Sequence, residues 1–143
     1  MKKAIVIGAT SGIGKELAKL LTENNYKVGI TGRRTELLLG LKMYNTNNII
    51  TRAFDVTDTA KVPGHLEALV NELGGLDLLI ICTGTGDIND DLDFEIEKRT
   101  IDTNVSGFTC VSSWTFNYFR KRNLGHLAAI SSVAGLRGGR RAP

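Results

Sequence analysis

The amino-acid sequence predicts an α/β fold, in which a doubly wound parallel sheet has helices on both faces. The prediction depends on two observations. Short apolar runs of strand length alternate with longer amphipathic segments along the chain. The first run, residues 3–8 (KAIVIG), is continuous and rich in β-branched residues, which is typical of a strand buried on both faces. Strands that alternate with helices form right-handed βαβ units, and these build parallel, helix-covered sheets.

The first half of the chain follows this alternation from the start. Residues 14–25 have leucines at helical spacing and end in polar asparagines, so we expect a helix there. Residues 26–32 (YKVGITG) and 49–56 (IITRAFDV) are apolar runs of strand length. Between them, the leucine-rich residues 34–44 predict a second helix.

The second half continues the pattern with a third helix over residues 58–75. Pro63 near its start and Gly74 at its end are tolerated in those positions, and Asp58 is expected to cap it. The remaining elements are strands at residues 76–84 and 126–131 and helical stretches at residues 93–107 and 108–122. A chain of 143 residues fits one domain of ordinary size, so we assign residues 1–143 to a single domain.

The composition limits the class of protein. The 42% content of hydrophobic residues allows a packed core, and no apolar run reaches membrane-spanning length. The N-terminus turns to glycine too soon for a signal peptide, so we expect a cytoplasmic protein without membrane contact. Cys82 and Cys110 lack the spacing of metal ligands, which predicts reduced, buried thiols and no metal site. The net charge of +3 permits an anionic ligand without indicating nucleic acid.

Ligands of parallel sheets bind at the carboxyl ends of the strands, and the first strand is followed there by a glycine-rich loop, GATSGIG. Gly8 permits a tight exit from the strand, Gly12 lets backbone approach a diphosphate, and Gly14 lets the helix pack closely on the sheet. Amide groups at the start of the helix then face the phosphates. Thr10 and Ser11 add hydroxyl donors and an N-cap. The alternative is a glycine-rich turn without a ligand.

After the second strand, the sequence TGRR points to the type of dinucleotide. A cofactor with a free ribose 2′-hydroxyl favours an acidic residue about 20 residues past the glycines. The chain instead has Arg33 and Arg34, with no acid until Glu36. Guanidinium groups suit a 2′-phosphate, so NADP is favoured over NAD. The alternative is a solvated first turn of the next helix.

The ends of the third and fourth strands supply further candidates. Asp55 in FDVTD is positioned either to accept a hydrogen bond from the adenine amino group or to bond within its own turn, and both alternatives stay open. Gly84 and Gly86 in CTGTGD let a ribose pass close to the backbone. The candidate cofactor-binding residues are Gly8, Thr10, Ser11, Gly12, Ile13, Gly14, Arg33, Arg34, Asp55, Val56, Cys82, Thr83 and Gly84.

Taken together, these motifs resemble the short-chain dehydrogenase/reductase family. GATSGIG, FDVTD, the loop after LDLLII, TIDTNVSG and ISSVAG occur in the family's order and spacing through nearly the whole chain. The resemblance implies a Rossmann-type NAD(P)-binding domain in an enzyme that transfers hydride between NADP(H) and a small carbonyl or alcohol substrate. It also implies catalytic roles for Asn104, which props a water and the catalytic lysine, and for Ser132, which hydrogen-bonds the substrate carbonyl. The alternatives are a helix-breaking asparagine and a capping serine.

The chain departs from the family at two places. After the fourth strand, the family's Asn-Asn-Ala-Gly is replaced by Ile-Cys-Thr-Gly, which keeps Gly84 but loses both asparagine amides. The family's Tyr-x-x-x-Lys motif, which manages the proton, would fall just past Pro143. None of Tyr26, Tyr44 and Tyr118 is expected to replace that tyrosine. We therefore expect residues 1–143 to be an incomplete domain, inactive alone, and the alternative function is a dinucleotide-binding module or pseudoenzyme without turnover.

The resemblance also bears on partners. In the family the helix at residues 108–122 commonly builds subunit contacts, so we expect a homo-oligomer. Its apolar side chains are expected to be short of partners: Phe108, Val111, Trp114 and Phe119. The arginines of the terminal RGGRRAP permit contacts with nucleic acid phosphates, but a solvated loop is favoured and no nucleic-acid partner is expected.

Overall fold

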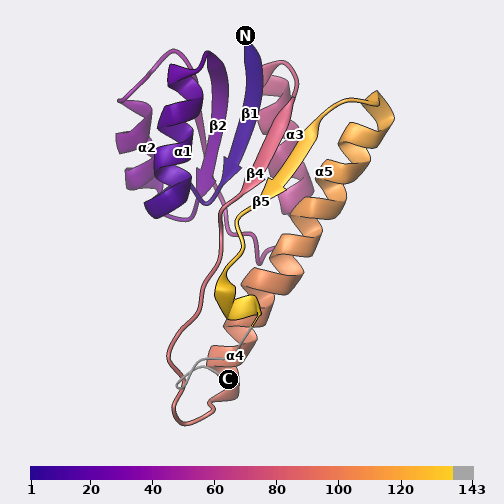
Figure 1. The fold of residues 1–143 in the computed structure, drawn as a ribbon. Helices are drawn as coiled ribbons and strands as arrows, with labels where there is room; N and C mark the ends of the chain where they lie inside the picture. The colour runs from indigo at the N-terminus through magenta and orange to yellow at the C-terminus, as the bar shows by residue number, and fades with distance from the viewer. Residues whose placement is uncertain (137–143) are drawn as a thin grey trace.

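Five parallel strands form a single sheet in the computed structural model, which describes residues 1–136 (Figure 1). The strands are β1 (Lys2–Ile7), β2 (Tyr26–Gly32), β3 (Ile49–Ala53), β4 (Leu78–Ile81) and β5 (His126–Ala129). Their order across the sheet is β3-β2-β1-β4-β5, with every neighbouring pair parallel. The chain runs outward from β1 to β3 and then returns to β4, so the winding reverses between β1 and β4. The predicted parallel α/β fold is confirmed.

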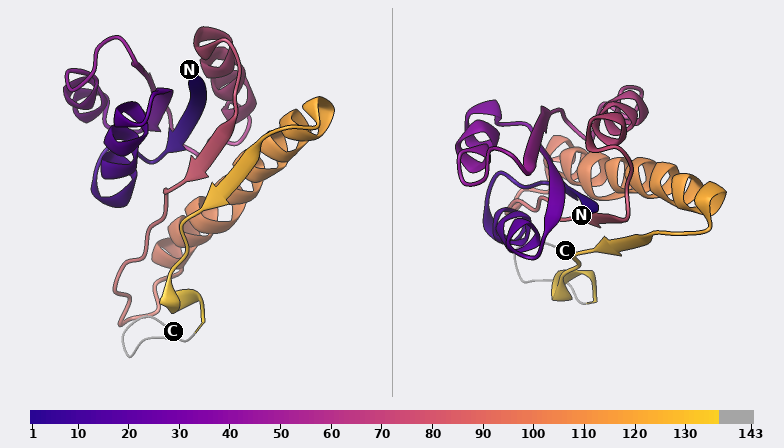
Figure 2. Two further views of the ribbon diagram at one scale, coloured as in Figure 1. Left: turned by 45° about the horizontal axis from the view of Figure 1, so that its top comes forward. Right: turned by 90° about the horizontal axis from the view of Figure 1, so that it is seen from above.

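Helices cover both faces of this sheet (Figure 2). They are α1 (Gly12–Glu23), α2 (Thr35–Lys42), α3 (Val62–Leu73) and α5 (Phe108–Arg122), while α4 (Phe94–Ile101) lies beyond the carboxyl edge of the sheet. One core cluster joins the sheet to α3 and α5, and a second joins it to α1 and α2. Ile5 and Ile7 of β1 belong to the first cluster and Val6 to the second, because successive side chains of a strand point to opposite faces. Both faces of β1 are buried, which explains its continuous apolar sequence.

The third helix begins later than the sequence predicts. It starts at Val62, with Pro63 in its first turn, and ends at Gly74, whose φ of 78° is left-handed. Residues before it form turns in which the Asp58 carbonyl accepts hydrogen bonds from the amides of Lys61 and Val62. The Asp58 carboxylate pairs with the Lys61 ammonium at 2.7 Å instead of capping the helix. The prediction that Asp58 caps this helix is therefore wrong, because its carboxylate forms a local ion pair with Lys61.

A π-helical segment, η1 (Asp102–Gly107), joins α4 to α5, so that residues 94–122 form one helical arm. The α4 end of this arm projects beyond the carboxyl edge of the sheet (Figure 1). Val111 and Phe119 are buried and Trp114 is half-buried in the cluster with α3, while Phe108 is exposed. The expectation that all four lack partners is therefore wrong for three of them, because α3 packs beside α5.

Cys82 and Cys110 are free thiols, as predicted. Both are half-buried, however, whereas the prediction was that they are buried. Within residues 1–136, no helix has the length and apolar character needed to cross a membrane. The same residues contain no group of three or more His, Cys, Asp or Glu side chains able to hold a metal ion. The terminal arginines considered for nucleic-acid contact, Arg137, Arg140 and Arg141, lie outside the described residues.

Candidate cofactor site

A pocket of about 630 Å³ opens at the carboxyl edge of the sheet, where the loops after β1, β2, β3 and β4 meet η1. Ten of the thirteen predicted cofactor residues line it: Gly8, Thr10, Ser11, Arg33, Arg34, Asp55, Val56, Cys82, Thr83 and Gly84. The other three, Gly12, Ile13 and Gly14, form the adjoining start of α1, where the Ile13 side chain is exposed. Four loops that are distant in sequence therefore form one concave site at the end of the sheet predicted for ligands.

Some pocket residues were missed by sequence reasoning. Arg99, Asp102 and Thr103 come from the helical arm, and Asp87 from the long loop before it. Arg99 and Asp87 face one another at 3.9 Å across this part of the pocket. Only the fold brings the arm beside the loops after β3 and β4, so no local sequence signal could have identified these residues.

The three glycines of the first loop serve different steric purposes. Gly8 has a φ of 85°, and a Cβ there would lie 2.8 Å from the Thr83 amide nitrogen. A Cβ on Gly14 would overlap the Gly8 carbonyl oxygen, so α1 approaches β1 as closely as backbone allows. Gly12 has a φ of 54°, but a Cβ there would meet no atom within 4 Å. The tight exit at Gly8 and the close packing at Gly14 are confirmed, and Gly12 borders open space at the start of the helix.

This open space has the polarity that suits a phosphate group. The first turn of a helix has amide groups without intrahelical acceptors and a positive dipole end. Ser11 occupies the N-cap position of α1 with extended backbone, but its hydroxyl makes no capping hydrogen bond. The predicted N-cap position is therefore confirmed at Ser11, but its side chain makes no capping bond and does not compete for these amides. The arrangement leaves the helix start accessible to a diphosphate.

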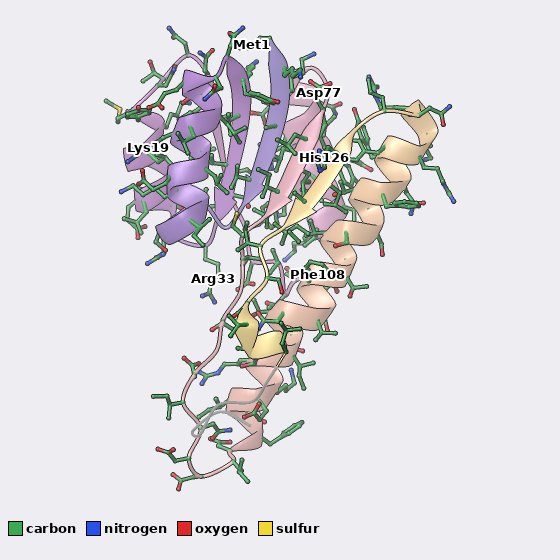
Figure 3. All side chains as sticks on the ribbon, viewed as in Figure 1. Met1, Lys19, Arg33, Asp77, Phe108 and His126 are labelled. Atoms are coloured by element: carbon green, nitrogen blue, oxygen red, sulfur yellow. The ribbon has the colours of Figure 1, made fainter. Side chains whose placement is uncertain are left out.

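The two arginines after β2 have different partners. The Arg34 guanidinium donates hydrogen bonds to Thr10 Oγ1 at 2.7 Å and to Ser11 Oγ at 3.1 Å. The Arg33 guanidinium extends from the carboxyl edge of β2, and its nearest carboxylate oxygen is Asp55 Oδ2 at 3.6 Å (Figure 3). Both side chains lie at the pocket, where their charge favours an anionic ligand.

The Asp55 side chain bonds within its own turn, which is one of the two roles that the sequence leaves open. Its Oδ1 accepts hydrogen bonds from the Thr57 amide and from the Thr57 hydroxyl, both at 2.9 Å. The second carboxylate oxygen faces Arg33. The local role is thus observed, and it fixes the Asp55 carboxylate in the wall of the pocket.

Cys82 takes the place where the family has the second asparagine of its motif, and its chemistry is different. The Cys82 amide donates to the Ile7 carbonyl at 2.8 Å, which continues the pairing of β4 with β1. Burial raises the pKa of the Cys82 thiol, so this side chain is neutral near pH 7. It serves as a small apolar surface against α1, since a Cβ on Gly14 would lie 3.1 Å from the Cys82 Cβ.

Asn104 lies in η1 and fastens the loop after β4 to the helical arm. Its Oδ1 accepts a hydrogen bond from the Thr85 amide at 2.9 Å, and its Nδ2 donates to the Thr85 carbonyl at 2.6 Å. Gly107 of the same segment packs against the loop after β3, where an added Cβ would lie 2.8 Å from Val56 Cγ2. Asn104 therefore acts on the pocket through Thr85, which lines it, and is not itself among the lining residues.

Ser132 follows β5 at the same edge of the sheet, outside the described lining of the pocket. Its side chain is exposed, and its Oγ accepts a hydrogen bond from the Ala134 amide at 3.2 Å. Ser132 thus caps the short helical turn Val133–Gly135. His126, by contrast, begins β5 at the opposite edge, far from Arg33 (Figure 3).

Comparisons with known proteins agree with the fold and the motifs. The family model for short chain dehydrogenases matches residues 2–143. Glycine betaine reductase ATRR of Emericella nidulans is 37% identical over 139 residues, which cover 94% of this chain and 11% of that protein. An uncharacterized oxidoreductase of Myxococcus xanthus is 34% identical over 142 residues, which cover 96% of this chain and 56% of the relative. The chain thus spans less than two thirds of the length of these relatives.

Solved structures with the same fold include coenzyme complexes. Actinorhodin polyketide ketoreductase with NADPH superposes with a TM-score of 0.91 at 26% identity, covering 99% of this chain and 57% of that one. ElxO with NADP bound gives a TM-score of 0.90 at 28% identity, covering 99% of this chain and 60% of that one. Because the family model matches nearly every residue, and the sheet and glycine loop agree with it, this chain belongs to the short-chain dehydrogenase family.

Proposed function

We propose that this chain binds NADP(H) in the pocket at the carboxyl edge of the sheet. In this proposal it forms the cofactor-binding part of an oxidoreductase that moves hydride between NADP(H) and a small carbonyl or alcohol substrate. The observation that supports it most strongly is the convergence of a glycine loop, two arginines and a helix start on one pocket of about 630 Å³. Two structural relatives carry NADP(H) in their names, which favours the same coenzyme here.

Each part of the pocket has a role in this proposal. The amides at the start of α1, next to Gly12 and Ile13, bind the diphosphate. Arg33 and Arg34 line the part of the pocket proposed for the ribose 2′-phosphate, and Asp55 and Val56 border the adenine. Around the ribose, the small residues of the loop after β4 leave room for close approach of backbone: Cys82, Thr83 and Gly84.

The chemistry is divided between coenzyme and protein. The bound nicotinamide supplies or accepts the hydride. Ser132 donates a hydrogen bond to the substrate carbonyl oxygen and stabilises the charge that develops there. This role requires the Ser132 hydroxyl, which now accepts from the Ala134 amide, to direct its own proton toward substrate. Asn104 acts on the site by holding the loop at Thr85.

A second candidate function, coenzyme binding without turnover, is favoured by the positions of the three tyrosines. Tyr26 begins β2, Tyr44 follows α2, and Tyr118 belongs to α5, and none of them is among the described residues that line the pocket. Sequencing of the coding region beyond the codon of Pro143 separates the two functions. A Tyr-x-x-x-Lys motif there supports the oxidoreductase, and a continuation without that motif supports the second candidate.

We expect the protein to bind NADPH at least about tenfold more tightly than NADH, because one charge-assisted hydrogen bond to the 2′-phosphate contributes roughly 1.5–3 kcal/mol. Titration of the protein into each reduced coenzyme, followed by nicotinamide fluorescence, measures both dissociation constants. Equal or tighter binding of NADH would contradict the assignment of NADP, and failure of both coenzymes to bind would contradict the proposed function itself.

We also propose that the helical arm forms a contact with a second copy of the chain. Five large apolar side chains of the arm are exposed, with exposed fractions of 67% for Phe94, 50% for Ile101, 56% for Val105, 38% for Phe108 and 62% for Phe116. An exposed apolar surface of this kind is typical of a protein–protein contact.

Phe116→Asp is expected to reduce the mass measured by sedimentation equilibrium, whereas Asn117→Asp, on the same exposed stretch, leaves it unchanged. A monomeric unaltered protein at micromolar concentration would refute the contact.

A further inference from the structure

The two arginines after β2 are adjacent in sequence, yet their surroundings differ in kind. From this difference we infer that Arg34 is a positioning residue, which holds the glycine loop open for a diphosphate, while Arg33 alone selects for the 2′-phosphate. The inference rests on the proposed function, because it concerns how the same pocket recognises its coenzyme.

Hydrogen bonds from Arg34 hold the glycine loop against the end of β2. One terminal nitrogen of its guanidinium donates to both Thr10 Oγ1 and Ser11 Oγ, at 2.7 and 3.1 Å, across more than 20 residues of sequence. Beside this contact Thr10 packs against Gly32, where an added Cβ would lie 2.5 Å from Thr10 Cγ2. A side chain at residue 32 would therefore push the loop away. The loop is held to β2 by a charged hydrogen-bonding group and by a close steric contact.

These hydrogen bonds change what the Ser11 hydroxyl can do. A serine at an N-cap commonly accepts a hydrogen bond from an amide in the first turn of its helix. Ser11 occupies that position with φ −162°, but its side chain makes no capping bond and accepts from Arg34 instead. Arg34 thus withdraws the competing hydroxyl from the helix start. The amides that a diphosphate needs are left available, whether or not the coenzyme has a 2′-phosphate.

The Arg33 side chain is held less firmly than that of Arg34. Its side chain is 74% exposed, and its ion pair with Asp55 is long, at 3.6 Å. Exposed ion pairs of this kind contribute little to stability. Asp55 itself is held by Thr57 and keeps its position without Arg33. Arg33 is therefore able to exchange Asp55 for an incoming 2′-phosphate at little cost, whereas Arg34 would have to release two loop hydroxyls.

The test compares the dissociation constants of NADPH and NADH for the unaltered protein and for Arg33→Ala and Arg34→Ala. Loss of one charge-assisted contact predicts a weakening of NADPH binding by about tenfold or more in Arg33→Ala, with NADH affinity changed by less than about twofold. Arg34→Ala is expected to weaken both coenzymes by a similar factor of about three to ten, so that their ratio stays within about twofold of the unaltered protein. Circular dichroism confirms that each variant is folded.

A double-mutant cycle separates positioning from a general loss of stability. If Arg34 acts through the Ser11 hydroxyl, Arg34→Ala in a Ser11→Ala background weakens NADH by a clearly smaller factor than in the unaltered background. Additive effects of the two substitutions would overturn the inference. So would a selective loss of NADPH in Arg34→Ala as large as that in Arg33→Ala. These results leave coenzyme binding itself intact, whereas failure of both coenzymes to bind the unaltered protein would overturn the proposed function and the inference together.

Discussion

Replacement of Gly14 by alanine is expected to lower the free energy of unfolding by about 3 kcal/mol or more, a value at the upper end of the cost of overpacking. A Cβ at this position would overlap the Gly8 carbonyl oxygen and lie 3.0 Å from the Gly8 carbonyl carbon and 3.1 Å from the Cys82 Cβ. Backbone atoms cannot turn away as a flexible side chain does. The Gly8 amide is moreover hydrogen-bonded to the Thr31 carbonyl at 3.2 Å, which fixes the loop against β2.

The overlap is relieved only if α1 moves away from the sheet. Such a movement exposes Ala18, whose side chain is fully buried in the cluster that joins α1 and α2 to the sheet. The loss of packing adds to the steric cost. For this reason the effect of a single methyl group is expected to exceed that of an ordinary surface substitution, which usually stays within about 0.5 kcal/mol.

Urea unfolding followed by far-ultraviolet circular dichroism measures this change. Gly40→Ala is the matched control, because Gly40 is exposed in α2 and an added Cβ there meets no atom within 4 Å. Alanine favours a helix over glycine, so this control is expected to raise the free energy of unfolding by about 0.5–1 kcal/mol. A Gly14→Ala protein as stable as the unaltered one would show that α1 does not pack on β1 in the way described.

Replacement of Gly12 by alanine is expected to weaken NADPH binding by about 5- to 150-fold, since one methyl group in a close-packed contact costs about 1–3 kcal/mol. The Cβ would project into the open space at the start of α1, where the proposal locates the diphosphate. The added Cβ meets no described protein atom within 4 Å, so the substitution acts on the ligand and on the left-handed backbone of residue 12. The measurement is the same fluorescence titration with NADPH.

Gly12→Asn distinguishes steric exclusion from backbone strain. The φ of 54° at residue 12 is left-handed, a conformation that asparagine tolerates better than alanine. Thermal unfolding is therefore expected to find Gly12→Asn more stable than Gly12→Ala. The coenzyme affinity is expected to be at least as low in Gly12→Asn, because its side chain is larger. Recovery of affinity in Gly12→Asn would instead attribute the loss to strain, and would argue against a diphosphate at this place.

Much of the fold was predictable because its signals are local. The continuous apolar run of β1 follows from burial of both faces, and the left-handed Gly74 follows from the need to end α3. Element boundaries were less predictable, as the start of α3 illustrates. Aspartate is a common N-cap residue, but the Asp58 carboxylate forms an ion pair with the nearby Lys61 ammonium instead. Two local interactions of similar strength competed there, and sequence pattern alone does not rank them.

In the candidate site, too, local features were predictable and contacts between distant residues were not. Sequence pattern alone predicts that a glycine loop, two arginines and a loop of small residues follow the first, second and fourth strands, because each signal depends on neighbours along the chain. The hydrogen bonds from Arg34 to Thr10 and Ser11, those between Asn104 and Thr85, and the place of Arg99 in the pocket appear only once the chain is folded. Such contacts join residues far apart in sequence. They depend on strand order, on the register of the sheet and on side-chain orientation, and these are set by the packing of the whole chain.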